Sequence, residues 1–123
     1  MSAEMEVIFS IQSQLFAVFR DADGSTHWSD YDGKKVRAAF PADDGTRCVV
    51  LLDPEVPSKA RFENLFCVDR DGKTMWTAEL PNTHDRYMEA QLKSDGLHAW
   101  SWSSYYITLD PADGRVMRRV FTK

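Results

Sequence analysis

The stretch Leu65-Phe66-Cys67-Val68-Asp69-Arg70-Asp71-Gly72 joins an apolar strand pattern to an Asp-Gly turn. Looser copies of it occupy residues 15–24 and 106–114. The turn glycines Gly24, Gly72 and Gly114 are separated by 48 residues (from 24 to 72) and 42 residues (from 72 to 114). A period of about 40–50 residues built from β-hairpins is typical of four-stranded propeller blades. The sequence therefore predicts an all-β chain, an antiparallel meander with about three blade-like repeats.

The composition is that of an ordinary folded domain. The chain has 123 residues, 43% of them hydrophobic, and a formal net charge of −4, so we expect one domain over residues 1–123. A mildly acidic chain without a basic face is a poor partner for nucleic acid or an anionic membrane, and we expect neither. The exception is a C-terminal basic cluster that alternation along a strand would divide between two faces, as at a solvated edge. Its members are Arg115, Arg118, Arg119 and Lys123.

The N-terminus and the cysteines both favour a cytoplasmic location. Residues 1–6 contain no basic segment leading into a long apolar run, so we expect no signal peptide. Cys48 and Cys67 each lie inside an apolar strand pattern. We expect two reduced, buried thiols, although a disulfide between neighbouring strands stays open.

Alternation of apolar and polar residues predicts about eleven strands. Residues 47–53 are apolar on both faces, so this strand should lie centrally and be covered on both sides. Residues 26–31 and 34–40 are expected to form a hairpin through Asp32-Gly33. For residues 82–93 a short capped helix competes with a strand, and the repeat register favours the strand.

Two segments, residues 64–76 and 95–116, resemble blades of the β-propeller repeats in pyrroloquinoline-quinone-type dehydrogenases and their non-catalytic relatives. The shared pattern is a strand opened by Asp-Gly, a strand of alternating small and aromatic residues, a strand ending in Asp, and a closing strand after a Gly turn. The resemblance implies the fold element alone. The quinone site of that family needs more blades and a vicinal cysteine pair, whereas Cys48 and Cys67 are not adjacent, so we expect no cofactor.

Closed propellers usually have 4–8 blades, and about three fit in this chain. Two arrangements follow. The repeats form either a compact barrel or sandwich, or an open propeller arc. An open arc could pair with a second copy, so a homodimer is also expected as an alternative, because pairing would cover exposed edges.

The sequence contains no pattern that defines an enzyme or a metal site. Nucleophile motifs and phosphate-binding glycine loops are absent. Residues 21–25 place their glycine fourth, whereas an EF-hand loop needs it sixth. The three histidines have no metal-ligand spacing. We therefore name no catalytic residue and no metal ligand, and a non-enzymatic role is favoured.

The best candidate binding residues are aromatic. His98, Trp100 and Trp102 alternate, so they project from one face of one strand. If that face is covered they are core, which the need to place four tryptophans in a small domain favours. If it is open they form a platform for a ligand or partner. The loop containing His84 and Arg86 is the second candidate, with a solvated turn as its simpler interpretation.

The leading functional hypothesis is a cytoplasmic, non-enzymatic module that binds a protein or small ligand through an aromatic-rich surface. A second hypothesis is a small bacterial immunity-type or accessory protein that binds a partner protein. A third is an enzyme or cofactor binder with a site near His84, Arg86 and His98.

Overall fold

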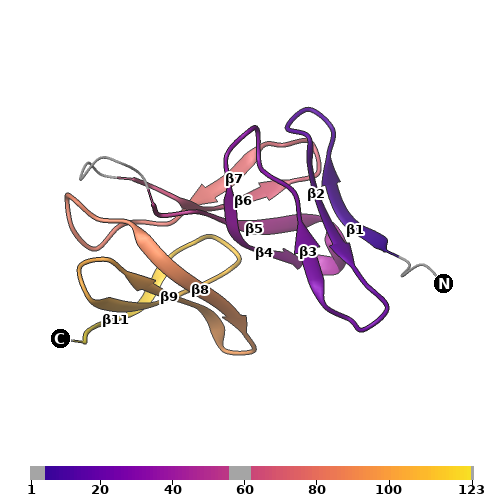
Figure 1. Cartoon of the computed structure of the whole chain (residues 1–123). Coiled ribbons are helices and arrows are strands. Elements are labelled where there is room, and N and C mark those ends of the chain that lie inside the picture. The colour runs from indigo at the N-terminus through magenta and orange to yellow at the C-terminus, as the bar shows by residue number, and fades with distance from the viewer. Residues whose placement is uncertain (1–4, 56–61, 123) are drawn as a thin grey trace.

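The computed structural model describes residues 5–55 and 62–122, which form three antiparallel sheets (Figure 1). The N-terminal sheet contains β1 (Glu6–Ile11), β2 (Phe16–Arg20) and β3 (Thr26–Trp28). The middle sheet contains β4 (Val36–Ala42), β5 (Arg47–Leu52), β6 (Leu65–Asp69) and β7 (Thr74–Thr77), with the 3-10 turn η1 (Asp43–Gly45) after β4. The C-terminal sheet contains β8 (Tyr87–Lys93), β9 (Gly96–Ser101), β10 (Tyr105–Leu109) and β11 (Val116–Phe121). The prediction of an all-β meander with propeller-blade-like repeats is confirmed.

The middle sheet is covered on both faces, as Figure 1 shows. Alternate residues of β5 point in opposite directions. Val49 and Leu51 belong to the apolar core shared with the C-terminal sheet, while Cys48 and Val50 belong to the core shared with the N-terminal sheet. The prediction that this strand is central and buried on both sides is therefore confirmed.

The recurring Asp-Gly phrase forms a similar turn in all three sheets, with one extra residue in the third turn. The aspartate side chain accepts hydrogen bonds from backbone N–H groups of the turn, and the glycine adopts a positive φ that residues with a β-carbon avoid. Oδ1 of Asp21 accepts from the N–H groups of Asp23 (2.9 Å) and Ser25 (3.0 Å). Oδ1 of Asp69 accepts from the N–H groups of Asp71 (2.9 Å) and Lys73 (3.0 Å), and Oδ1 of Asp110 accepts from the N–H of Ala112 (2.9 Å). The glycine φ values are 84° at Gly24, 82° at Gly72 and 75° at Gly114.

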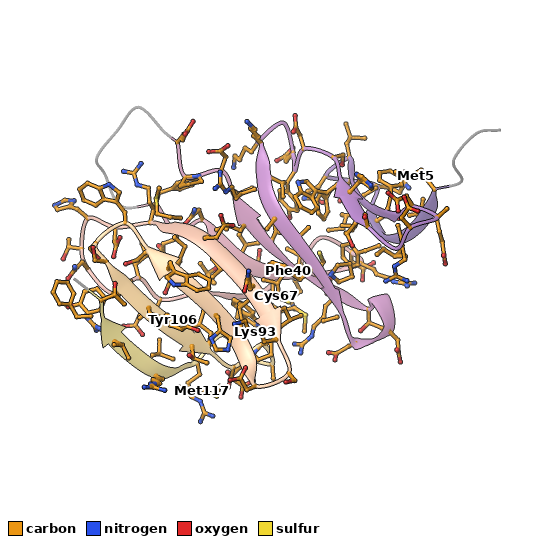
Figure 2. The ribbon with its side chains drawn as sticks, turned by 60° about the horizontal axis from the view of Figure 1, so that its bottom comes forward. Met5, Phe40, Cys67, Lys93, Tyr106 and Met117 are labelled. Carbon is orange, nitrogen blue, oxygen red and sulfur yellow. The ribbon has the colours of Figure 1, made fainter. Side chains whose placement is uncertain are left out.

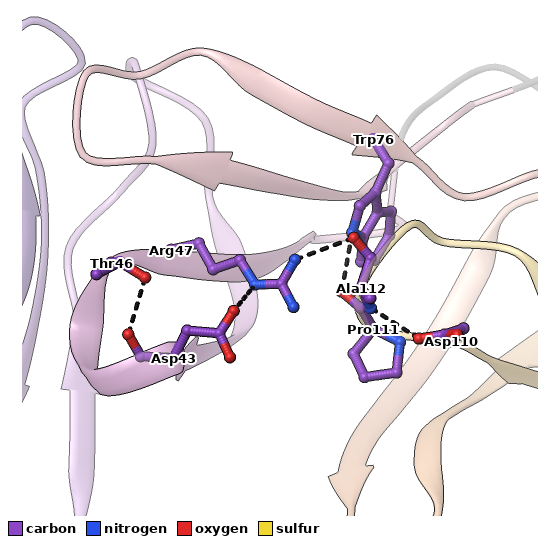
Figure 3. A network of polar contacts seen from close by, with 7 residues as sticks. All are labelled: Asp43, Thr46, Arg47, Trp76, Asp110, Pro111 and Ala112. Carbon is purple, nitrogen blue, oxygen red and sulfur yellow. Dashed lines mark hydrogen bonds and ion pairs between the residues drawn. The ribbon is translucent and has the colours of Figure 1, made fainter.

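The third turn docks on the middle sheet (Figure 3). The Nε1 of Trp76 donates a hydrogen bond to the Pro111 carbonyl at 3.0 Å. The Nη1 of Arg47 donates to the Ala112 carbonyl at 3.0 Å, and its Nε lies 2.5 Å from an Asp43 carboxylate oxygen. These contacts fix the middle and C-terminal sheets to each other at their turn ends.

The N-terminal sheet is attached to the middle sheet by a different tryptophan contact. Trp28 follows Gly24 by four residues, as Trp76 follows Gly72, but its Nε1 donates to the Val36 carbonyl at 2.9 Å instead of docking on the next turn. The predicted hairpin between residues 26–31 and 34–40 is wrong beyond one Tyr31–Lys34 bridge, because β3 pairs with β2 and β4 pairs with β5. The Asp32-Gly33 turn forms locally, but the chain then crosses to a new sheet.

The structure also tests the predictions for residues 82–93 and for the two cysteines. Residues 87–93 are a strand, as the repeat register favoured. Cys48 and Cys67 are buried and free, so the alternative of a disulfide is wrong. No helix in the described part of the chain is long and apolar enough to cross a membrane. Most of residues 1–6, on which the expectation about a signal peptide depends, lies outside the described residues.

Candidate functional site

The two complete sheets can be compared position by position, because Asp69 and Asp110 open equivalent turns and the strand pairings are known. The middle sheet turns one apolar, buried face toward the C-terminal sheet. The C-terminal sheet turns the equivalent face outward; we call it the outer face. The outer-face residues, each followed in parentheses by the middle-sheet residue at the equivalent position, are Glu89 (Ala38), Gln91 (Phe40), His98 (Val49), Trp100 (Leu51), Tyr106 (Leu65), Thr108 (Cys67) and Arg118 (Trp76).

This replacement makes the outer face more polar than the equivalent face of the middle sheet. A further sheet packed here would bury Arg118 and the ion pair between Glu89 and Arg37, and burying charged groups costs free energy. Arg118 also stands four residues after Gly114, where Trp76 stands after Gly72, so the docking tryptophan is missing from this sheet. Repeat arrays commonly end on a unit with a polar outer surface.

The outer face carries a cavity of about 460 Å³, within the usual range for ligand pockets. Its walls come from β9, β10 and β11 and include His98, Tyr106, Met117 and Arg118. Figure 2 labels Tyr106 and Met117 on this sheet and Cys67 in the middle sheet. The cavity thus combines aromatic, apolar and cationic groups on one open sheet face.

His98 lines the cavity and forms side-chain hydrogen bonds with two neighbouring residues. Its side chain is buried, and its Nε2 lies 2.7 Å from Oδ1 of the exposed Asp95. Because a carboxylate only accepts, Nε2 is the donor, and Nδ1 faces the Tyr106 hydroxyl. The hydrogen bond from His98 holds the pKa of Asp95 below its ordinary value. Trp100 packs edge-on against Tyr106, with ring centroids 4.9 Å apart.

The structure decides between the two interpretations of the aromatic strand. Trp100 is half-buried and Trp102, in the turn after β9, is 58% exposed. The interpretation that these indoles form core is therefore wrong, because none of the sheets formed by residues 5–55 and 62–122 covers this side of β9. Their position fits the open platform, although whether they bind anything stays a prediction.

The loop of His84 and Arg86 serves a structural purpose. Between them, the buried Asp85 accepts hydrogen bonds from the N–H of Ser103 at 3.1 Å and from its hydroxyl at 2.5 Å. Arg86 donates from Nη1 to the Pro54 carbonyl at 3.0 Å, and its own carbonyl accepts from the Trp102 N–H at 2.8 Å.

His84 is exposed, and neither it nor Arg86 lines the cavity beside His98. The predicted grouping of His84 and Arg86 with His98 is therefore not found. Sequence reasoning instead missed Asp95, Tyr106 and Arg118. The signal for Arg118 was present, since it occupies the position that holds tryptophan after the other two turn glycines.

The structure also bears on metal binding and on thiol chemistry. Within residues 5–55 and 62–122 no group of three or more His, Cys, Asp or Glu side chains is arranged to hold a metal ion. Burial raises the pKa of the Cys67 thiol to about 11 and raises that of Cys48 further. Both thiols lie in the cores between the sheets, away from the outer face.

The fold is that of a β-propeller-blade repeat protein, and comparison with solved structures supports this class. The chain is similar to BamB from Moraxella catarrhalis, a PQQ-like β-propeller repeat protein, with a TM-score of 0.53 and 16% identity over 100% of this chain and 38% of that one. It is also similar to the computationally designed Ika8 protein, with a TM-score of 0.52 and 12% identity over 95% of this chain and 37% of that one. The chain thus spans less than two fifths of each. At these identities the likeness concerns the fold alone.

Residues 33–121 match the family described as Domain of unknown function (DUF7957), and the chain belongs to that family. The matched region starts just before β4 and covers the middle and C-terminal sheets. The N-terminal sheet, whose attachment differs from that of the others, lies outside it. No curated protein matches the chain.

Proposed function

We propose that this protein is a non-enzymatic binding module whose binding surface is the outer face of the C-terminal sheet. One observation carries the proposal: where the middle sheet has a buried apolar surface, the outer face has His98, Tyr106 and Arg118 around an open cavity, and Trp100 packs against Tyr106. These side chains can stack on a planar group, donate hydrogen bonds and attract an anion. Aromatic and arginine side chains also dominate binding energy at protein interfaces.

The location that accompanies this proposal is the cytoplasm. Cys48 and Cys67 are free and buried, a state that suits a reducing compartment. An enzyme or cofactor site is the weaker alternative, because His84 and Arg86 do not line the cavity with His98.

The test is a fragment screen by ¹⁵N–¹H correlation NMR, using benzoate, indole-3-carboxylate and other planar aromatic acids as probes. We expect the shifted amides to cluster on β9, β10 and β11, and we expect Tyr106→Ala to remove the response. Met75→Ala, at an exposed apolar residue of the middle sheet, is the matched control and should respond like the wild type. Shifts that cluster on other sheets, or no shifts at all, would overturn the proposal.

A further inference from the structure

The edge strand β11 has properties of a docking strand. It lies at one end of the strand order β11-β10-β9-β8 in the described C-terminal sheet. Three of its apolar side chains are exposed: Met117 by 47%, Val120 by 38% and Phe121 by 56%. An edge strand presents unpaired backbone N–H and C=O groups, and exposed apolar side chains beside them favour pairing with another chain.

The same strand is locally basic in an acidic protein. Arg119 is engaged, since it donates to the Pro81 carbonyl at 2.9 Å and lies 4.5 Å over the Tyr105 ring. Arg118 points the other way and lines the cavity beside Thr108. No acidic side chain in the described parts of the chain forms an ion pair with Arg118. A cation in this position is available to an anionic group from outside.

We infer that β11 recruits an extended acidic segment of a partner protein, which adds to the C-terminal sheet as a fifth strand. The inference rests on the proposed function, because it uses the same outer face. Strand addition provides affinity through main-chain hydrogen bonds, and pockets for alternate side chains provide specificity. A glutamate or aspartate of the segment pairs with Arg118, and a neighbouring apolar residue on the same face contacts Val120. The bulge at Met117 disturbs the ladder, so the pairing runs from Arg118 to Phe121.

A second copy of this chain fits the edge less well. Antiparallel two-fold pairing of two β11 strands keeps both outer faces on the same side, so a central register places either Arg118 opposite Arg118 or Arg119 opposite Arg119 of the second copy. Like charges directly opposite each other destabilise a sheet. An acidic segment places opposite charges there instead. Charge complementarity therefore selects the acidic partner.

The test uses two blocked peptides, acetyl-Thr-Glu-Thr-Val-Thr-Glu-amide and the same sequence with lysine for glutamate. In the first, glutamate and valine alternate along one face of the strand, as pairing with Arg118 and Val120 requires. Titration into the ¹⁵N-labelled protein should shift β10 and β11 amides with the glutamate peptide only, and hydrogen exchange of β11 amides should slow. Arg118→Glu should weaken binding of the glutamate peptide at least about tenfold, because it replaces an attractive charge by a repulsive one. Lys73→Glu, an equal charge change at an exposed turn of the middle sheet, should leave the affinity unchanged.

Several further results would overturn the inference. Two N-methylated versions of the glutamate peptide, each modified at one of the two alternate sets of amides, test the main-chain hydrogen bonds. If both bound as tightly as the unmodified peptide, the inferred main-chain pairing would be wrong. If the lysine peptide bound equally, or if β11 instead paired in a dimer of this chain, the acidic partner would be wrong. Aromatic fragments that bind beside His98 without peptide binding at β11 would overturn this inference and leave the proposed function standing. Failure of both probes would remove both proposals.

Discussion

The ring of Trp76 covers Gly114 so closely that a β-carbon on this glycine would lie 2.5 Å from the Trp76 Cε3 atom. Trp76 follows the second copy of the repeated phrase, and Gly114 ends the third. Trp76 lies on β7, four residues after the turn glycine of the middle sheet, and Gly114 is the turn glycine of the C-terminal sheet. Together with the hydrogen bond from Trp76 to the Pro111 carbonyl, this contact explains why the turn requires glycine and how one sheet docks on the next.

Gly114→Ala should destabilise the protein much more than Gly24→Ala. At Gly24 the substitution meets no atom within 4 Å, so only the strained positive φ remains, at a cost of about 1 kcal/mol. At Gly114 the overlap with the Trp76 ring adds to that strain, for a total of about 3 kcal/mol or more. Urea denaturation of both variants measures the difference. Equal losses would show that Trp76 does not dock as described.

Asn64 should be a second essential link between these two sheets. It is fully buried, its Nδ2 donates to the carbonyls of Leu52 at 3.0 Å and Tyr87 at 2.7 Å, and its Oδ1 accepts from the Tyr87 N–H at 2.9 Å. Asn64→Leu leaves buried backbone groups without partners, and we expect a loss of about 3 kcal/mol in the free energy of unfolding. The exposed Asn82→Leu is the control. A loss below about 1 kcal/mol at position 64 would contradict this role.

The two thiols should be inert in the folded protein. Burial raises the pKa of both Cys48 and Cys67, the latter to about 11, so the reactive thiolate is scarce near pH 8. We expect almost no reaction with a thiol-specific chromogenic disulfide under native conditions and a rapid reaction of both thiols in guanidinium. Rapid labelling of either cysteine in the native protein would contradict the buried positions.

The pair of Asp95 and His98 should contribute stability that acid removes. The hydrogen bond from His98 lowers the folded-state pKa of Asp95 below its ordinary value of 3.8. The folded protein therefore binds this proton less readily than the unfolded chain, so the contribution is present above the unfolded pKa and is lost as the pH falls through the folded pKa. Asp95→Asn should reduce the difference between urea midpoints at about pH 5 and about pH 3, because an aspartate in the unfolded chain gains its proton over this range.

The exposed Asp71→Asn, in the turn of the middle sheet, is the control for that measurement. If both variants changed the acid sensitivity equally, the effect would come from overall charge and not from the contact with His98.

Much of the fold was predictable because it depends on local patterns. The spacing of the Asp-Gly turns predicts the repeat, and the double-sided apolar pattern of residues 47–53 predicts the central strand. The separation of β3 from β4 was not predictable, since the Asp32-Gly33 turn is equally compatible with a hairpin and a crossover. What decides it is the tertiary packing of Trp28 against the Val36 carbonyl.

The candidate site was predictable in part, for a related reason. Alternation placed His98 and Trp100 on one face, but whether that face was open depended on what packs against the sheet. Tyr106 and Arg118 join them only through the pairing of β9, β10 and β11, and the bulge at Met117 sets which β11 side chain points outward. His84 and Arg86 flank Asp85, and the hydrogen bonds of this buried aspartate to Ser103 anchor their loop beside the turn after β9, away from the cavity.

The dimer considered from the sequence stays untested, and its measurement is also the most direct test of an open outer face. If the C-terminal sheet ends the stack, sedimentation equilibrium should give a monomer of 14.1 kDa. A dimer that Arg118→Glu dissociates and Lys73→Glu leaves intact would show instead that a second copy covers the outer face, and would contradict a surface kept open for a ligand.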